Sequence, residues 1–158
     1  MQTSLSAQTK IGYINSQVIM EQLPEAQDAQ KQLDGLTSEW QNELAKMQSD
    51  IQIKFEEYDK RKLIMSDKRR AEVERELQDL DKKLVDYRQQ KFGTNGELFT
   101  KQNELMKPIQ EKIFKAVKDV ADSEGYDYVV DRNSSTLLLY ANNKHDLTQK
   151  VLEKLQQK

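Results

Sequence analysis

The sequence predicts a mostly helical α+β protein: a long antiparallel coiled-coil hairpin on a small β-containing body that oligomerises. A stretch from Pro24 to about Val120 has almost no turn-forming residues and is rich in Glu, Gln, Lys, Asp and Leu. Apolar residues recur there at alternating steps of three and four, which is typical of a coiled-coil seam. Short β-like runs occur only near the two ends of the chain.

The apolar seam indicates two helical arms joined by a reversal. One continuous helix of this length would be on the order of 140 Å long, which is uncommon. The apolar pattern fails near 61–68, where Ser66 is a suitable N-cap and Asp67 favours a new helix start. We therefore place the tip at 61–68. The seam residues are Leu33, Leu36, Trp40, Leu44, Met47, Ile51, Phe55 and Tyr58 on the outgoing arm and Val73, Leu77, Leu80, Leu84 and Tyr87 on the return.

The body is drawn from both ends of the chain, residues 10–23 and 109–157, and the hairpin occupies 24–108. Residues 1–9 are expected to be a disordered tail, and they lack the apolar core of a signal peptide. The expected body elements are strands at about 10–15, 126–131 and 136–140 and a C-terminal helix at about 146–156. Strands this short make a marginal domain, so we expect the body to gain its core from other copies of the chain.

The return arm contains residues that disfavour a helix. Gly93 and Gly96 each cost about 1 kcal/mol relative to Ala in a helix, and Pro108 removes a backbone hydrogen bond. We interpret Gly93, Gly96 and Pro108 as a hinge, and Gly125 as a helix stop.

The composition gives no indication of an enzyme. Charged residues make up 33% of the chain, hydrophobic residues 36%, and the net charge is −2 with no Cys. Nucleotide-binding loops and a nucleophile elbow are missing from the sequence, and no apolar run reaches the roughly 18 residues of a membrane span. The one histidine, His145, with Asp146 and Ser134 or Ser135, fits a helix start and a turn better than a catalytic triad. We expect no catalytic residue, metal or cofactor.

The predicted tip is strongly basic. Residues 59–70 hold six basic and two acidic side chains, a net charge of +4, around Leu63, Ile64 and Met65. One interpretation is a solvated helix end; the other is a contact with an anionic surface such as lipid headgroups. The basic residues are Lys60, Arg61, Lys62, Lys68, Arg69 and Arg70.

A second apolar stripe lies off the seam of the return arm. Val85, Phe92, Phe99 and Met106 repeat every seven residues at a position that faces away from the seam. Regularly spaced exposed phenylalanines require a reason. Either they pack against the body or a neighbouring subunit, or they line a surface for varied apolar partners, to which Met is well suited.

The two ends of the chain resemble the Skp/OmpH family of periplasmic chaperones. The resemblance covers about 10–157 and is carried by KIGYINSQVIMEQLPEAQ at Lys10–Gln27 and KIFKAVKDVADSEGYDYVVD at Lys112–Asp131. It implies a jellyfish-like homotrimer, with a β-barrel body made by all three chains and three hairpin tentacles around a cavity. It also implies a periplasmic location and ATP-independent holding of unfolded outer-membrane β-barrel proteins.

This chain departs from the family in its charge. Some members are strongly basic, whereas this chain is slightly acidic and concentrates positive charge at the tip. The family's lipopolysaccharide site on the return arm is matched only by scattered Lys91, Lys101 and Lys107, so we do not transfer it. Contact with anionic lipid or lipopolysaccharide is expected only at the tip.

The resulting hypothesis is a holdase in which Val85, Phe92, Phe99 and Met106 contact the client. The alternative is a structural trimeric spacer or tether whose basic tips touch a membrane. A cytosolic prefoldin-like chaperone fits the order of strands and helices poorly. A nucleic-acid partner is not expected, because the basic run is short and no aromatic platform accompanies it.

Overall fold

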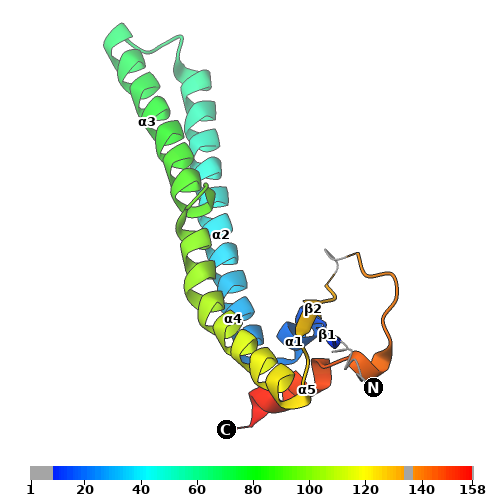
Figure 1. Ribbon diagram of the computed structural model, residues 1–158. Helices are drawn as coiled ribbons and strands as arrows, with labels where there is room; N and C mark the ends of the chain where they lie inside the picture. Colours follow the sequence, from blue (N-terminus) through cyan, green and yellow to red (C-terminus); the bar gives the residue numbers. More distant parts are fainter. Residues whose placement is uncertain (1–8, 134–136, 158) are drawn as a thin grey trace, which may run out of the picture. The chain divides into compact units, whose positions relative to one another are not determined.

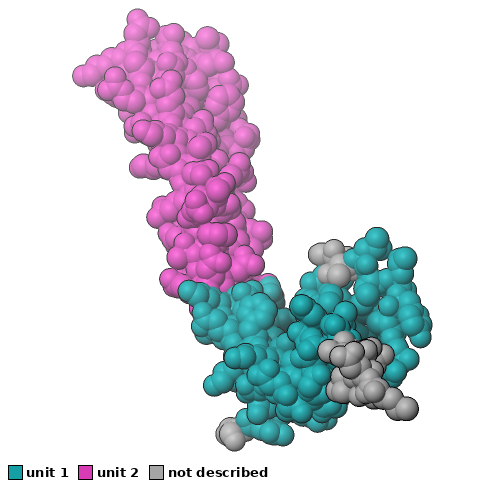
Figure 2. Space-filling view, in the orientation of Figure 1, with its two compact units in different colours: residues 1–30, 105–158 teal, residues 31–104 magenta. Residues whose placement is uncertain are grey.

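The computed structural model describes residues 9–133 and 137–157. The chain divides into two compact units (Figure 2). We call residues 1–30 with 105–158 the body unit, and residues 31–104 the arm unit. All of the predicted disordered tail except Thr9 lies outside the described residues.

The hairpin is built from three helices (Figure 1): α2 at Pro24–Arg61, α3 at Asp67–Phe92 and α4 at Glu97–Glu124. As predicted, α2 begins at Pro24, where a missing N–H costs nothing. The chain reverses over 62–66, inside the predicted tip. Ser66 is the N-cap of α3, because its side chain accepts a hydrogen bond from the Arg69 backbone N–H at 3.3 Å. The helical hairpin of the predicted fold class is therefore confirmed.

Contacts across the seam hold α2 and α3 antiparallel. Trp40 and Val73 are buried, and Lys54 forms an ion pair with Glu76 at 2.6 Å. Phe55, which we placed on the seam, is instead 51% exposed. Lys54 is the partly buried residue at this level of α2, and it keeps the alternating steps of three and four just as well. The seam therefore passes through Lys54 and leaves Phe55 at its edge.

The return arm is interrupted where the two glycines predicted it. α3 ends at Phe92 and α4 begins at Glu97, and Asn95 adopts a left-handed conformation with φ 61°. Pro108 lies within α4, which continues to Glu124. Gly125 follows with φ 67°, in the conformation that commonly ends a helix.

The body unit contains a two-stranded parallel sheet of β1 (Ile11–Ile14) and β2 (Tyr128–Asp131), in register from Ile11 opposite Tyr128 to Ile14 opposite Asp131. It also contains two short helices, α1 (Ser16–Gln22) and α5 (Thr148–Gln156), a 3-10 turn, η1 (Asn143–His145), the start of α2 and most of α4. The core of the body unit consists of Ile14, Ile19, Leu23, Ala26, Ala29, Ile109, Ile113, Ala116, Val120, Leu147, Val151, Leu152 and Leu155.

The predicted third strand at 136–140 is not formed over Leu137–Tyr140. Residue 136 lies outside the described residues. Leu137 and Leu139 are 89% and 88% exposed, and only β1 and β2 form the sheet of the described residues. A strand requires a hydrogen-bonding neighbour, and none of the residues that the structure describes pairs with this segment as a strand. The apolar run therefore predicted a strand at a segment that has no strand partner among the described residues.

Candidate functional site

The polar groups around His145 serve local structure. The Tyr126 hydroxyl lies 3.2 Å from His145 Nδ1, and the Asp146 carboxylate accepts the Thr148 N–H at 2.9 Å. Ser134 and Ser135, the other members of the weighed triad, lie outside the described residues. In the ranges 9–133 and 137–157, no group of three or more His, Cys, Asp or Glu side chains is placed to hold a metal ion. No helix within these ranges is long and apolar enough to span a membrane.

The tip presents two apolar side chains to solvent. Leu63 and Ile64 are 91% and 85% exposed. Three of the six basic residues pair with carboxylates close by in the chain: Lys62 with Asp59, Arg69 with Glu72, and Arg70 with Asp67. Lys60, Arg61 and Lys68 have no carboxylate partner in the part of the chain that the structure describes. The tip thus combines unpaired cations with an exposed apolar pair.

The predicted stripe of four residues does not form one continuous surface. Val85 and Phe99 are 62% and 50% exposed. Phe92 is partly buried and packs edge-on against Trp40, with ring centroids 5.9 Å apart. Met106 packs against the core of the body unit. The loop 93–96 interrupts the helix between Phe92 and Phe99, so the seven-residue spacing no longer keeps these two residues on one face.

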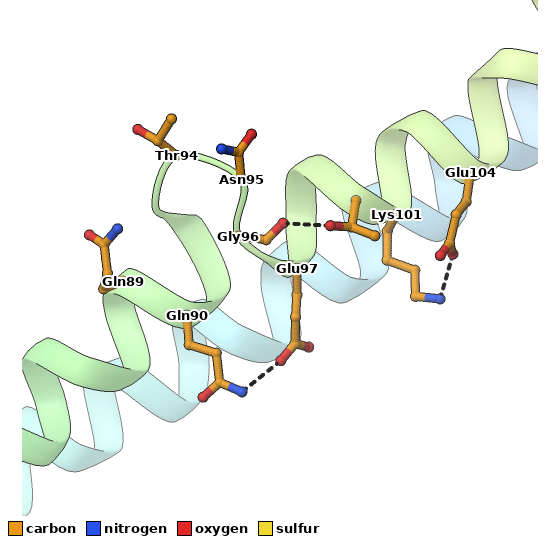
Figure 3. Close-up of a pocket in the computed structure, with 9 residues that line it drawn as sticks. Gln89, Gln90, Thr94, Asn95, Gly96, Glu97, Lys101 and Glu104 are labelled. Carbon is orange, nitrogen blue, oxygen red and sulfur yellow. Dashed lines mark hydrogen bonds and ion pairs between the residues drawn. The ribbon is translucent and has the colours of Figure 1, made fainter.

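The loop 93–96 borders an open pocket of about 540 Å³ with a polar lining (Figure 3). In the close-up, the Gln90 side chain donates to Glu97 and Lys101 pairs with Glu104. The Thr100 hydroxyl donates to the Gly96 carbonyl at 3.2 Å. The sequence identified the two glycines of this region, but not the role of Glu97.

Sequence reasoning did not predict that Ile53, Phe55 and Phe114 would be exposed. Ile53 and Phe55 in the arm unit are 55% and 51% exposed, and Phe114 in the body unit is 71% exposed. The exposure of Phe114 could have been predicted from its position directly after Ile113, which packs in the core. A large apolar residue next to a seam position faces partly away from the seam.

The pKa shifts in both units arise from hydrogen bonds and ion pairs at the surface. A hydrogen bond from Lys54 holds the pKa of Glu76 below its usual value, and Lys150 does the same for the pKa of Glu124. The hydrogen bond to Glu104 raises the pKa of Lys101. These three shifts stabilise the charged form of groups that are already charged at neutral pH, and the hydrogen bond that Tyr58 donates to Glu74 raises the pKa of a phenol that is already neutral there. None of the shifts therefore prepares a group for acid–base chemistry.

The chain combines a helical hairpin that exposes apolar residues with a small α/β body. This combination places it in the class of coiled-coil arm proteins. The family model described as outer membrane protein (OmpH-like) matches residues 10–155, and the chain belongs to this family.

Relatives with a curated description are similar along almost the whole chain. The chaperone protein Skp of Pectobacterium atrosepticum is 29% identical over 157 residues, covering 96% of this chain and 88% of the relative. The chaperone protein Skp of Yersinia enterocolitica is 30% identical over 151 residues, covering 92% and 85%. A crystal structure described as an OmpH-like outer membrane chaperone, from Caulobacter crescentus, has a TM-score of 0.75 at 14% identity and covers 98% of this chain and 88% of its own. This last likeness supports the fold.

The different environments of Phe92 and Phe99 can be tested by truncation. We expect Phe92→Ala to lower the free energy of unfolding by about 2 kcal/mol, less than the ~3–5 kcal/mol of a fully buried Phe, because Phe92 is partly buried on Trp40. Phe99→Ala, at a half-exposed position, should cost less than about 1 kcal/mol. Urea unfolding followed by circular dichroism measures both, and equal losses would contradict the assignment.

Proposed function

We propose that this protein is an ATP-independent holdase chaperone of the periplasm that binds unfolded outer-membrane β-barrel proteins and prevents their aggregation. Membership of the OmpH-like family and the chaperone names of its relatives support this proposal. The main structural support comes from the arm unit. Single apolar side chains such as Phe55, Val85 and Phe99 are exposed there on charged helices.

The contacts of such an arm with a client would each be weak. Covering a half-exposed Phe or Val contributes on the order of 1 kcal/mol, because fully burying one contributes about 1.5–3 kcal/mol. Several such contacts on linked arms add up through high effective concentration, while each one breaks easily. The client therefore stays mobile, and its folding elsewhere drives release by mass action.

We limit the proposed client contacts on the predicted stripe to Val85 and Phe99. Phe92 and Met106 are engaged in packing within their own units, and covering them with a client would require that packing to open. Phe55 is a further candidate on α2, because it is exposed to the same degree as Phe99.

Replacing Val85 and Phe99 together with Ser should weaken client binding about thirtyfold, since two contacts of roughly 1 kcal/mol are lost. The measurement is suppression of light scattering when an unfolded outer-membrane protein is diluted from urea. The matched control is Leu63→Ser with Ile64→Ser, which removes two more exposed apolar side chains from the same unit. Full activity of the Val85/Phe99 variant, or an equal loss of activity in the control, would contradict the proposal that these two residues contact the client.

The same assay separates the holdase from a structural spacer or tether. A spacer has no effect on the aggregation of unfolded proteins, whereas a holdase suppresses it without ATP.

We propose that the protein works as a homotrimer assembled through the body unit. Exposed apolar side chains on this unit support assembly: Ile11, Phe114, Tyr128, Leu137, Leu139 and Tyr140 are all at least half exposed. Within residues 9–133 and 137–157 the parallel sheet has two strands, and sheets of this kind are normally covered on both faces. Leu137–Tyr140 from one copy would find its missing strand partner on another copy, which would also complete the predicted third strand.

Light scattering should therefore give a mass of about three times the 18.5 kDa chain. Leu137→Asp with Leu139→Asp should shift the protein to a lower mass, because charge at an assembled apolar surface is costly. The control is Leu63→Asp with Ile64→Asp, which also places two charges at exposed apolar positions, here at the tip. A single-chain mass for the unmodified protein would refute the trimer.

We propose that the tip contacts an anionic lipid surface. The unpaired charges of Lys60, Arg61 and Lys68 provide electrostatic attraction, at about 1 kcal/mol for each basic residue near the surface. Leu63 and Ile64, which point into solvent, would enter the interface and add apolar burial. The total for the three cations is about 3 kcal/mol, roughly a hundredfold in affinity.

Changing Lys60, Arg61 and Lys68 to Gln should thus weaken binding to vesicles containing phosphatidylglycerol by roughly a hundredfold in sedimentation assays at low salt. The control variant changes Lys46, Lys82 and Lys83 to Gln, removing the same charge from exposed positions along the arm unit. Equal effects of the two variants would assign binding to net charge and not to the tip.

A further inference from the structure

The break between α3 and α4 has a defined backbone structure. The Gly93 N–H donates to the Gln89 carbonyl at 2.9 Å, and the Gly96 N–H donates to the Gly93 carbonyl at 2.8 Å. A Cβ atom at Gly93 would collide with the Gln89 carbonyl oxygen, and one at Gly96 would come within 2.9 Å of the Gln90 carbonyl oxygen. Both glycines are therefore required for close backbone approach, and the loop closes in one particular way.

The Glu97 carboxylate bridges this break with both of its oxygens. Oε1 accepts the Gln90 side-chain amide at 3.0 Å, and Oε2 pairs with Lys91 Nζ at 2.5 Å. Gln90 and Lys91 belong to the last turn of α3, whereas Glu97 is the first residue of α4. Figure 3 shows the Gln90 and Glu97 side chains directed toward each other across the loop. The Lys91 side chain is only 16% exposed, so salt screens this ion pair less than it screens a pair at the open surface.

The same end of α3 is seated on Trp40 of α2. Lys91 Nζ lies 4.8 Å from the centre of the indole ring, and Phe92 meets this ring edge-on at 5.9 Å. Trp40 is only 7% exposed. A cation over an indole and an edge-to-face aromatic pair both favour the observed arrangement. Lys91 therefore links α3, to which it belongs, with α2 through Trp40 and with α4 through Glu97.

These side-chain contacts replace the backbone bonds that the break removes. In an uninterrupted helix, hydrogen bonds between residues four apart would make α3 and α4 one rigid rod. The loop 93–96 ends that ladder, and α2 carries Gly35, a weak helix former, only five residues before Trp40. Without other contacts the arm unit would bend easily at this level.

We propose that Gln90, Lys91 and Glu97, seated on Trp40, form a latch that holds the joint at 93–96 closed, and that release of Glu97 lets the arm bend there. The latch acts within the arm unit. The proposal does not depend on the chaperone function, and its test is made without a client.

The chain has no Cys, so paired labels are straightforward. Lys83→Cys and Asn103→Cys place spin labels at exposed positions on either side of the joint. An excess of unlabelled protein restricts the signal to distances within one chain. Glu97→Ala should broaden the label distance distribution at least twofold. It should also speed hydrogen exchange at the Gly96 and Thr100 amides by about tenfold, since hydrogen bonds to a charged group are lost.

The matched control is Glu104→Ala. It removes the 2.8 Å ion pair with Lys101, which lies on the same helix but does not cross the joint. This variant should leave the label distances and the two amides unchanged. Glu97→Gln, which keeps an acceptor for Gln90 but loses the ion pair, should give an intermediate broadening. Wild-type distances and exchange in Glu97→Ala, or the same broadening in Glu104→Ala, would overturn the latch.

Discussion

The narrow apolar seam of the helices is the constraint on which the rest of the structure depends. A helix with one thin apolar stripe and an otherwise charged surface cannot be covered by a sheet or a broad core, and a second helix of the same kind buries it best. Leu33, Trp40 and Val73 are buried on this seam in the arm unit. The chain reverses over 62–66 because doubling back supplies that second helix from the same chain. The exposed tip is a consequence of this reversal.

The hairpin could be predicted from the sequence because its determinants are local. The Pro24 helix start, the Ser66 cap and the glycine break each depend on residues within a turn of one another. The stripe from Val85 to Met106 was predicted less well because helical periodicity assumes an unbroken helix. Four non-helical residues at 93–96 change the rotational phase, so that Phe92 turns to Trp40 and Phe99 turns to solvent. The two glycines predicted a break in the helix. They did not predict how far the break would rotate the residues that follow it about the helix axis.

The body unit shows a second reason why the sequence of one chain does not predict the whole fold. The strand predicted at 126–131 is formed, because β2 pairs with β1 from the opposite end of the chain. The run at 136–140 has equal propensity, yet Leu137 and Leu139 remain exposed. Propensity describes what a segment can form, whereas pairing depends on a neighbour that is distant in the chain or belongs to another chain. The body unit has an apolar core of its own but leaves outer apolar residues exposed, and this exposure is the observation behind the proposed assembly.

The joint and the proposed client contacts compete for the same aromatic residues. Trp40 and Phe92 are large aromatic side chains near the break, and their contact fixes the end of α3 on α2. Because these two rings pack on each other, neither is free to contact a client. The same packing gives Val85 and Phe99 defined positions on opposite sides of the loop 93–96. A bend at the joint changes the spacing between these two contacts without altering either side chain. Because unfolded clients offer apolar segments at irregular spacing, an arm with adjustable contacts can hold more of them than a rigid one.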